Sequence, residues 1–136
     1  MAISIHILGE LYGVDQQTLS FVENLEPIIR RVVRESRFNV LDTAFHQFHP
    51  VGVTGFVLLA ESHLSVHTWP EESYLALDIF SCGSPEQALH AFEALVRELA
   101  PTEVEKKIID RGLSWKSRGV SSSLPYEAVG KACGTS

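Results

Sequence analysis

A chain of 136 residues has room for one compact domain and little else. Hydrophobic residues make up 45% and charged residues 21%, which is typical of a soluble fold and excludes a disordered chain. The formal net charge of −6 excludes a nucleic-acid binder that relies on a generally basic surface.

Membrane and secretory roles find no support in the sequence. Apolar runs such as residues 56–60 are far too short to cross a bilayer. The N-terminus has no cationic region and no long apolar core, so we expect no secretory signal. The two cysteines, Cys82 and Cys133, do not make a disulfide framework, and the simplest expectation is a reducing, cytoplasmic setting.

The N-terminal part of the chain alternates between strand and helix patterns. Residues 3–11 predict a first strand, and Asp15 can cap the helix that follows. Pro27 should kink or split that helix, whose apolar residues recur at helical spacing: Leu19, Val22, Leu25, Ile29, Val32 and Val33. Residues 38–48 predict a second strand, and residues 49–52 predict a turn.

Residues 53–60 predict a third strand with an unusual pattern. Both of its faces are apolar, so both should be covered. A short chain has few elements with which to cover two faces. The pattern is therefore a first indication that a second protomer supplies one cover.

The remaining segments complete a sheet with helices. Residues 63–68, 75–80 and 104–110 predict three more strands, and Ser84 caps a helix over residues 85–99. We therefore expect an α/β protein, a two-layer α+β sandwich with one mostly antiparallel sheet and two main helices on one face. A single domain should span residues 1–116, followed by a C-terminal tail over residues 117–136 that is rich in Ser and Gly.

Polar side chains cluster near the middle of the chain. Alternation along a strand places His63, Ser65 and His67 on one face. In the next strand Asp78 and Cys82 share a parity. If the two polar faces meet, imidazoles, a carboxylate and a thiol converge, which is typical of an active site.

A metal site is one interpretation of this cluster. The possible ligands are His46, His49, His63, His67 and Cys82. However, His46 and His49 face opposite sides of a strand, and no Cys-x-x-Cys pair exists. We therefore expect no metal.

Two other interpretations concern the same residues. A hydrolase could use Ser62 or Cys82 as nucleophile, with His67 as base and Asp78 to orient it, although the Gly-x-Ser-x-Gly elbow is absent. Alternatively, the histidines are structural and are satisfied by backbone carbonyls. The density of polar groups in one short apolar sheet argues against this last interpretation.

Three segments carry a resemblance to a known family. They are residues 45–55 (FHQFHPVGVTG), residues 61–71 (ESHLSVHTWPE) and residues 78–83 (DIFSCG). Together with His6 and the segment that follows it, they resemble the prokaryotic S-adenosylmethionine decarboxylase proenzyme, a pyruvoyl-dependent decarboxylase. The resemblance covers about residues 3–115, and its Glu-Ser-His…His-Thr-Trp-Pro-Glu core is highly specific.

The resemblance implies a zymogen that makes its cofactor from its own backbone. Ser62 would attack the carbonyl of Glu61, and autocatalytic cleavage would leave chains 1–61 and 62–136 with a covalent pyruvoyl group at residue 62. A substrate amine would then form a Schiff base with that group, so no pyridoxal-binding lysine would be required. The implied activity converts S-adenosylmethionine to the aminopropyl donor for spermidine synthesis.

The resemblance also implies roles for other residues. His67 matches the processing base, Thr54 stands where the family has a hydroxyl that assists processing, and Cys82 matches the acid that protonates the α-carbon. The substrate would be bound by Phe48, Glu71, Leu64 and Val66, with Phe48 stacked on adenine and Glu71 on a ribose hydroxyl. Protomers would pair sheet to sheet as a homodimer and build each site from both copies.

Some features leave alternatives open. Ser62 and His67 have opposite parity, so a bulge or turn at Glu61–Ser62 is needed to bring them together. Glu72 and Leu75 depart from the family pattern near the nucleoside, so the same machinery could decarboxylate L-ornithine or L-arginine. A non-pyruvoyl Ser/His hydrolase and a structural dimerisation module are the remaining alternatives.

Overall fold

The structure is a computed structural model, and it describes residues 3–112. In chain order its strands are β1 (Ser4–Tyr12), β2 (Val40–Gln47), β3 (Val53–Leu59), β4 (Ser62–Trp69), β5 (Tyr74–Ser81) and β6 (Glu103–Arg111). Its helices are α1 (Gln16–Ser20), α2 (Val22–Glu35) and α3 (Pro85–Leu99), with a 3-10 turn η1 (Pro70–Glu72) between β4 and β5. The expected tail over residues 117–136 lies outside the described residues.

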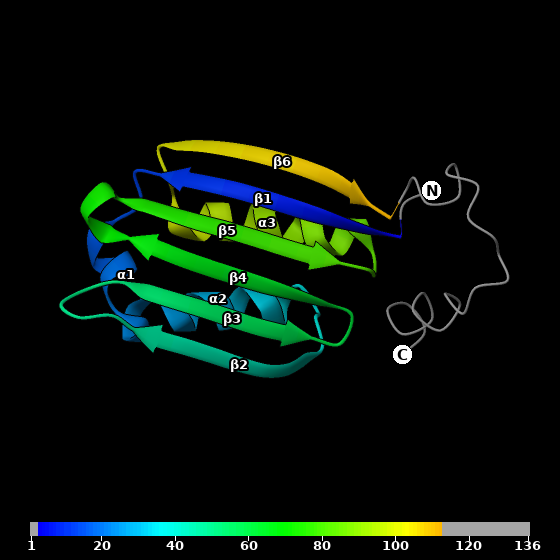
Figure 1. Cartoon of the computed structure of the whole chain (residues 1–136), viewed down its shortest axis with the longest axis horizontal. Helices are drawn as coiled ribbons and strands as arrows, with labels where there is room; N and C mark the ends of the chain where they lie inside the picture. Colours follow the sequence, from blue (N-terminus) through cyan, green and yellow to red (C-terminus); the bar gives the residue numbers. More distant parts are fainter. Residues whose placement is uncertain (1–2, 113–136) are drawn as a thin grey trace, which may run out of the picture.

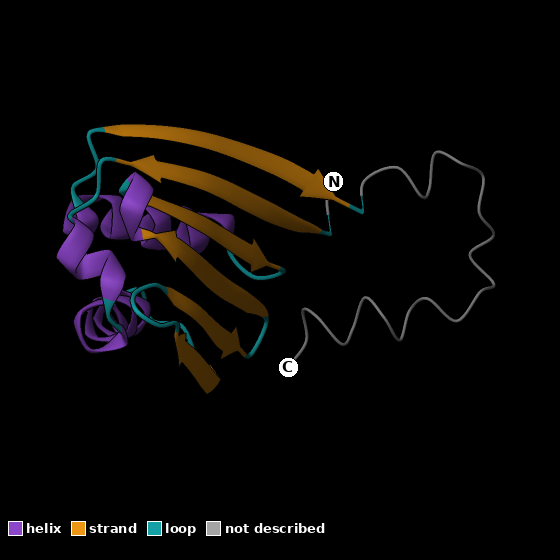
Figure 2. Ribbon diagram, turned by 60° about the vertical axis from the view of Figure 1, so that its left-hand side comes forward, coloured by secondary structure: helices purple, strands orange, loops and turns teal. Residues whose placement is uncertain are grey.

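The six strands form one antiparallel sheet in the order β2-β3-β4-β5-β1-β6. The helices α2 and α3 lie side by side on one face of this sheet (Figures 1 and 2). The expected two-layer α+β sandwich is therefore confirmed. We call the other side of the sheet, which no helix of the described chain covers, the open face.

The helical segment is interrupted at Phe21 and not at Pro27. Asp15 caps α1 as expected, its carboxylate accepting from the backbone N–H of Thr18. The chain then turns extended at Phe21, and α2 runs unbroken through Pro27. Pro27 lacks an N–H, so α2 loses one backbone hydrogen bond there and still continues. The predicted split was therefore wrong in position.

The hydrophobic core fills the space between the sheet and the helices. From α3, the stripe of Ala88, Phe92, Leu95 and Leu99 is buried, as the sequence predicted. The sheet contributes alternate residues, and its most buried side chains include Ile7, Leu11, Leu64, Val66 and Leu75. Burying such a side chain stabilises the fold by about 1.5–3 kcal/mol, so this layer fixes which face of each strand points inward.

The strand β3 is apolar on both faces, as its pattern predicted, but the helices cover only one of them. Val53 and Val57 point into the core, whereas Phe56 and Leu58 lie on the open face and remain 39% and 40% exposed. Within one protomer the second apolar face of β3 is therefore uncovered. No helix among residues 3–112 is long and apolar enough to span a membrane.

The contact between Gly9 and Phe92 tests this packing. A methyl group on Gly9 would lie 2.5 Å from a ring carbon of Phe92, so α3 and β1 approach closely only because Gly9 has no side chain. We expect Gly9→Ala to lower the free energy of unfolding by about 1–3 kcal/mol in urea denaturation. The double variant Gly9→Ala/Phe92→Leu should lose less than the sum of the two single variants, and full additivity would contradict this account.

Candidate active site

At one end of the sheet, the turn between β3 and β4 brings together what we call the Ser62 group: Glu61, Ser62 and Cys82. Glu61 lies in the turn, Ser62 is the first residue of β4, and Cys82 directly follows β5. The backbone N–H of Cys82 donates to the carbonyl oxygen of Glu61 at 3.1 Å. The carbonyl that precedes Ser62 is thus already held by a hydrogen-bond donor.

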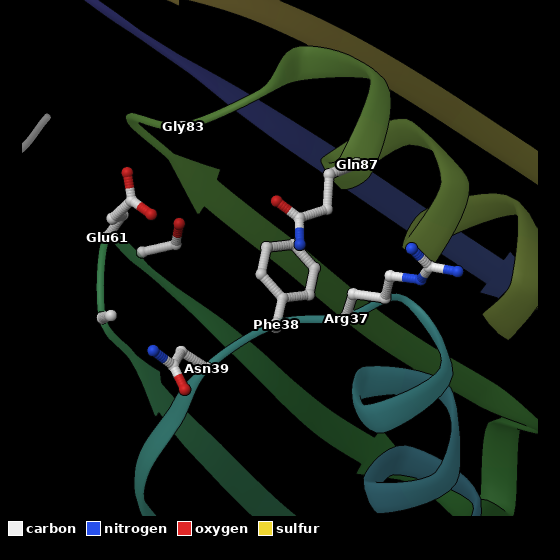
Figure 3. Close-up of a pocket in the computed structure, with 8 residues that line it drawn as sticks. Arg37, Phe38, Asn39, Glu61, Gly83 and Gln87 are labelled. Atoms are coloured by element: carbon white, nitrogen blue, oxygen red, sulfur yellow. The ribbon is translucent and has the colours of Figure 1, made fainter.

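A pocket of about 240 Å³ opens beside the Ser62 group. It is lined by Arg37, Phe38, Asn39, Ala60, Glu61, Ser62, Gly83 and Gln87. Figure 3 shows Glu61 and Gly83 on one side of this space and Phe38, Asn39 and Gln87 across from them. Arg37 has a left-handed backbone with φ of 65°, a conformation that costs a residue with a side chain about 1 kcal/mol or more.

Cys82 is the one cysteine among residues 3–112. Proton donation from Cys82 needs the reduced thiol. Any assay of this residue therefore belongs in the presence of a reductant.

At the other end of the sheet lies what we call the His67 group: Thr54, His67, Phe48 and Glu71. Thr54 and His67 are cross-strand partners on the open face, with Oγ1 of Thr54 and Nδ1 of His67 3.0 Å apart. Phe48 follows β2 and is 46% exposed, and Glu71 is exposed in η1. The structure therefore brings together Thr54 and His67, the two residues for which the resemblance implied roles in processing.

The two groups do not meet within one protomer. The register of β4 against β3 and β5 is continuous from Ser62 onward, so no bulge lies in β4. His67 follows Ser62 by five positions, which along a strand is roughly 16 Å and the opposite face. A turn is present at Glu61, but it does not shorten this distance. The expectation that a bulge or turn at Glu61–Ser62 brings Ser62 and His67 together was therefore wrong.

Two expected substrate contacts also need correction. Leu64 and Val66 are fully buried between β4 and the helices, each with 0% exposure. Both side chains belong to the core, where no substrate reaches them. The resemblance assigned both residues by their place in the motif, but alternation along β4 sends its even-numbered residues inward.

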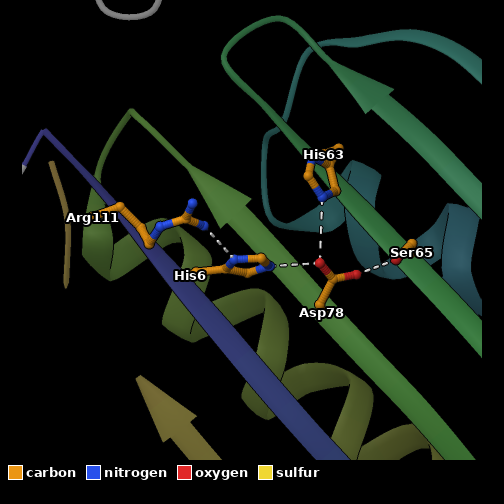
Figure 4. A network of polar contacts seen from close by, with 5 residues as sticks. All are labelled: His6, His63, Ser65, Asp78 and Arg111. Carbon is orange, nitrogen blue, oxygen red and sulfur yellow. Dashed lines mark hydrogen bonds and ion pairs between the residues drawn. The ribbon is translucent and has the colours of Figure 1, made fainter. Parts of the chain in front are cut away.

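A polar network lies on the open face near the Ser62 group (Figure 4). The carboxylate of Asp78 accepts from Nε2 of His6 at 2.6 Å, from Nε2 of His63 at 3.3 Å and from the hydroxyl of Ser65. Arg111 contacts Nδ1 of His6 at 3.0 Å. Sequence reasoning found His63, Ser65 and Asp78, but it missed His6 and Arg111, which come from the two ends of the described chain.

The contact with Arg111 fixes the protonation of His6. A guanidinium has donors only, so Nδ1 of His6 must accept, and the ring proton lies on Nε2, where it is donated to Asp78. His6, His63 and Asp78 each offer an atom within 4.8 Å of the others, a spacing that could suit a metal. A metal on Nε2 of His6 would place an N–H on Nδ1 against the Arg111 donors, so this geometry does not fit a metal site.

Hydrogen bonding controls the charge of Asp78. Partial burial alone would raise the pKa of this carboxyl, but the hydrogen bonds from Ser65, His6 and His63 outweigh it and hold the pKa below its ordinary 3.8. Asp78 is therefore ionised at neutral pH. The network contains one anion, one cation at Arg111 and a neutral His6.

Comparisons with known proteins agree on one family. The family model for S-adenosylmethionine decarboxylase matches residues 5–112. An S-adenosylmethionine decarboxylase proenzyme from Thermoplasma volcanium is 47% identical over 112 residues, covering 82% of this chain and 86% of that protein. A proenzyme of the same name from Sulfurihydrogenibium is 40% identical over 111 residues, covering 82% and 84%.

A solved structure agrees with the sequence relatives. The crystal structure of the adenosylmethionine decarboxylase from Aquifex aeolicus superposes with a TM-score of 0.79 at 32% identity, covering 90% of this chain and 97% of that one. The antiparallel sheet backed by helices is therefore the fold of a known decarboxylase. This chain belongs to the S-adenosylmethionine decarboxylase family.

Replacement of Asp78 tests the network. We expect Asp78→Asn to lower the free energy of unfolding at pH 7 by about 1–2 kcal/mol, because three donors lose a charged acceptor that is partly exposed. The pKa of Asp78 is lowered on folding. The stabilisation that the ionised carboxylate adds to the free energy of unfolding is therefore complete above pH 3.8, and it is lost as the pH falls through the lowered pKa. Urea denaturation at several pH values should therefore show the difference between wild type and variant shrinking below about pH 3.8.

Asp110→Asn provides the matched control, because Asp110 is exposed on the edge strand β6. It should change stability little at any pH. A loss for Asp78→Asn that is independent of pH would contradict the ionic account.

Proposed function

We propose that this chain is a self-cleaving decarboxylase that acts on S-adenosylmethionine and forms its pyruvoyl cofactor at residue 62. The observation that carries the proposal is the hydrogen bond from Cys82 N–H to the Glu61 carbonyl, directly beside the Ser62 hydroxyl. A polarised carbonyl next to a hydroxyl is what an acyl shift from nitrogen to oxygen requires. Family membership supports the same activity.

The proposed cleavage needs only groups of the chain itself and water. The Ser62 oxygen adds to the Glu61 carbonyl carbon, and the peptide C–N bond breaks as an ester C–O bond forms. Removal of the Ser62 α-proton expels the Glu61 carboxylate and leaves a dehydroalanine. Water then replaces its nitrogen, which departs as ammonia, and the residue becomes pyruvoyl.

Other residues take the roles that the family resemblance implies. When formed, the pyruvoyl group supplies a sink for the electrons left behind by carbon dioxide. His67, held by Thr54, acts as the processing base. Cys82, when reduced, lies beside the Ser62 position and returns a proton to the α-carbon.

The separation of the two groups leads us to propose a homodimer with shared sites. The Ser62 group and the His67 group lie at opposite ends of the same sheet (Figure 1). A two-fold axis through the open face would bring the end of each sheet that carries the Ser62 group over the end of the partner's sheet that carries the His67 group. Phe56, Leu58 and Trp69, each about two-fifths exposed on that face, would then be covered.

S-adenosylmethionine is the substrate that the available observations favour. The relatives in the comparisons are named for S-adenosylmethionine, and nothing among them supports ornithine or arginine. Leu75, one of the departures from the family pattern, is fully buried in the core. Phe48 and Glu71 remain exposed and free to contact a nucleoside. The cytoplasmic location stays a prediction.

Cleavage itself is the first test. Intact-mass analysis of the purified protein should give chains 1–61 and 62–136, the second with a blocked N-terminus. Ser62→Ala should stay full length, whereas Ser65→Ala removes a hydroxyl from the same strand and should still be cleaved. A wild-type chain that stays intact while active would favour a hydrolase, and an intact inactive chain would favour a structural module.

Mixed dimers test whether the sites are shared. Alone, Ser62→Ala should not be cleaved, and His67→Ala should be cleaved slowly. When the two variants are co-expressed in equal amounts, random pairing places roughly half of each chain in mixed dimers. There the His67→Ala chain keeps its Ser62 and receives the intact histidine of the other chain, so it alone should be cleaved. No gain over His67→Ala alone would refute the shared site.

A further inference from the structure

The self-cleavage proposed above creates a structural problem at β4. Cleavage before Ser62 cuts the connection between β3 and β4. The first residue of a central strand then becomes a chain end. Chain ends fray unless they are tied down. Residue 62, which is then the reactive residue, would be the first to fray.

His63 is the side chain placed to prevent this. Its ring stacks on Phe56 of β3, with centroids 5.5 Å apart and planes 24° apart. On the other side it stacks on Phe80 of β5, at 5.7 Å and 7°. Its Nε2 also donates to Asp78 of β5. The residue next to the new terminus is therefore fastened to both neighbouring strands by contacts that do not involve the turn.

We infer that His63 is a positioning residue that holds the newly made terminus in register after self-cleavage, with Asp78 and His6 as its support. The inference rests on the proposed function, because it needs the cut between Glu61 and Ser62. It assigns His63 no contact with substrate.

The other residues of the network keep the carboxylate of Asp78 ionised and oriented toward His63. His6 donates to the carboxylate through Nε2 because Arg111 occupies its other nitrogen. Ser65 binds the second carboxylate oxygen. With these donors in place, Asp78 stays ionised and oriented, so it presents an acceptor to His63 (Figure 4).

The position of Asp78 in the chain connects this anchor to the chemistry. Asp78 lies on β5, four residues before Cys82, and Ser62 pairs with Ser81 on the same strand. The anchor thus aligns the first residue of β4 with the end of β5. Loss of the anchor should misplace residue 62 relative to Cys82, which lowers kcat, while Phe48 and Glu71 at the other end of the sheet keep KM nearly unchanged.

Hydrogen exchange separates this role from ordinary packing. We compare peptides from residues 63–69 in wild type and His63→Ala, both after cleavage and in the uncleavable Ser62→Ala background. After cleavage, His63→Ala should speed exchange about tenfold, the effect of losing a hydrogen bond to a charged group. In the uncleavable chain, where the turn still tethers the strand, the change should be less than about threefold.

Kinetics and two further variants complete the experiment. In cleaved enzyme assayed with S-adenosylmethionine under reducing conditions, kcat should fall about tenfold with KM within about twofold. His63→Phe keeps the stacking but loses the hydrogen bond, so it should fold and show the same change in smaller degree. His90→Ala removes an exposed imidazole from α3 and should change nothing.

The outcomes distinguish the two proposals. A wild-type chain that never cleaves overturns the proposed function and this inference with it. If the wild type cleaves, faster exchange of equal size in cleaved and uncleavable chains, or a change confined to KM, overturns the inference alone. The same holds if His63→Ala prevents cleavage, since the residue would then act before the cut.

Discussion

Side-chain alternation along β4 is the constraint on which the candidate site depends. Leu64 and Val66 are fully buried beneath the helices, and β4 is paired along its length with β3 and β5. A slip of one residue would turn these core side chains outward, so the register cannot adjust to suit the chemistry. Ser62 and His67 are therefore held apart by the same packing that stabilises the fold. In the proposed homodimer, a second copy of the sheet brings the two groups together.

The polar network at the centre of the open face pairs its own charges. It contains the Asp78 anion and the Arg111 cation, joined through a neutral His6. Aromatic rings of Phe56 and Phe80 flank the network on both sides of His63. Burial of an isolated carboxylate would be costly, whereas a network whose donors and acceptors are matched can be buried between two sheets at much lower cost.

The helices and strands could be predicted from the sequence more fully than the contacts between them. Period and capping located α3 from Ser84, and alternation placed His63, Ser65 and His67 on one face. Two residues of the polar network were not predicted, and both for the same reason. His6 and Arg111 reach Asp78 only because β1 lies between β5 and β6, and strand order is a tertiary property that no local pattern encodes.

The incorrect expectations have equally physical origins. Pro27 was expected to break a helix, but it removes only one backbone hydrogen bond from α2, and the extended backbone at Phe21 makes the break instead. Leu64 and Val66 were assigned to substrate from a linear motif. A motif names neighbours along the chain, whereas a strand sends successive neighbours to opposite sides.

The proposed shared site also sets the order in which the protein matures. If the base comes from the partner subunit, the turn at Glu61 stays intact until two sheets have paired. During folding that turn is the covalent link that registers β4 against β3, and long-range pairing is easier to establish while it is present. By the time the link is cut, the open face is covered, and the stacked ring of His63 already holds the strand from both sides. Cleavage after assembly thus removes a tether that the fold has ceased to need, whereas cleavage before assembly would release the end of a central strand into water.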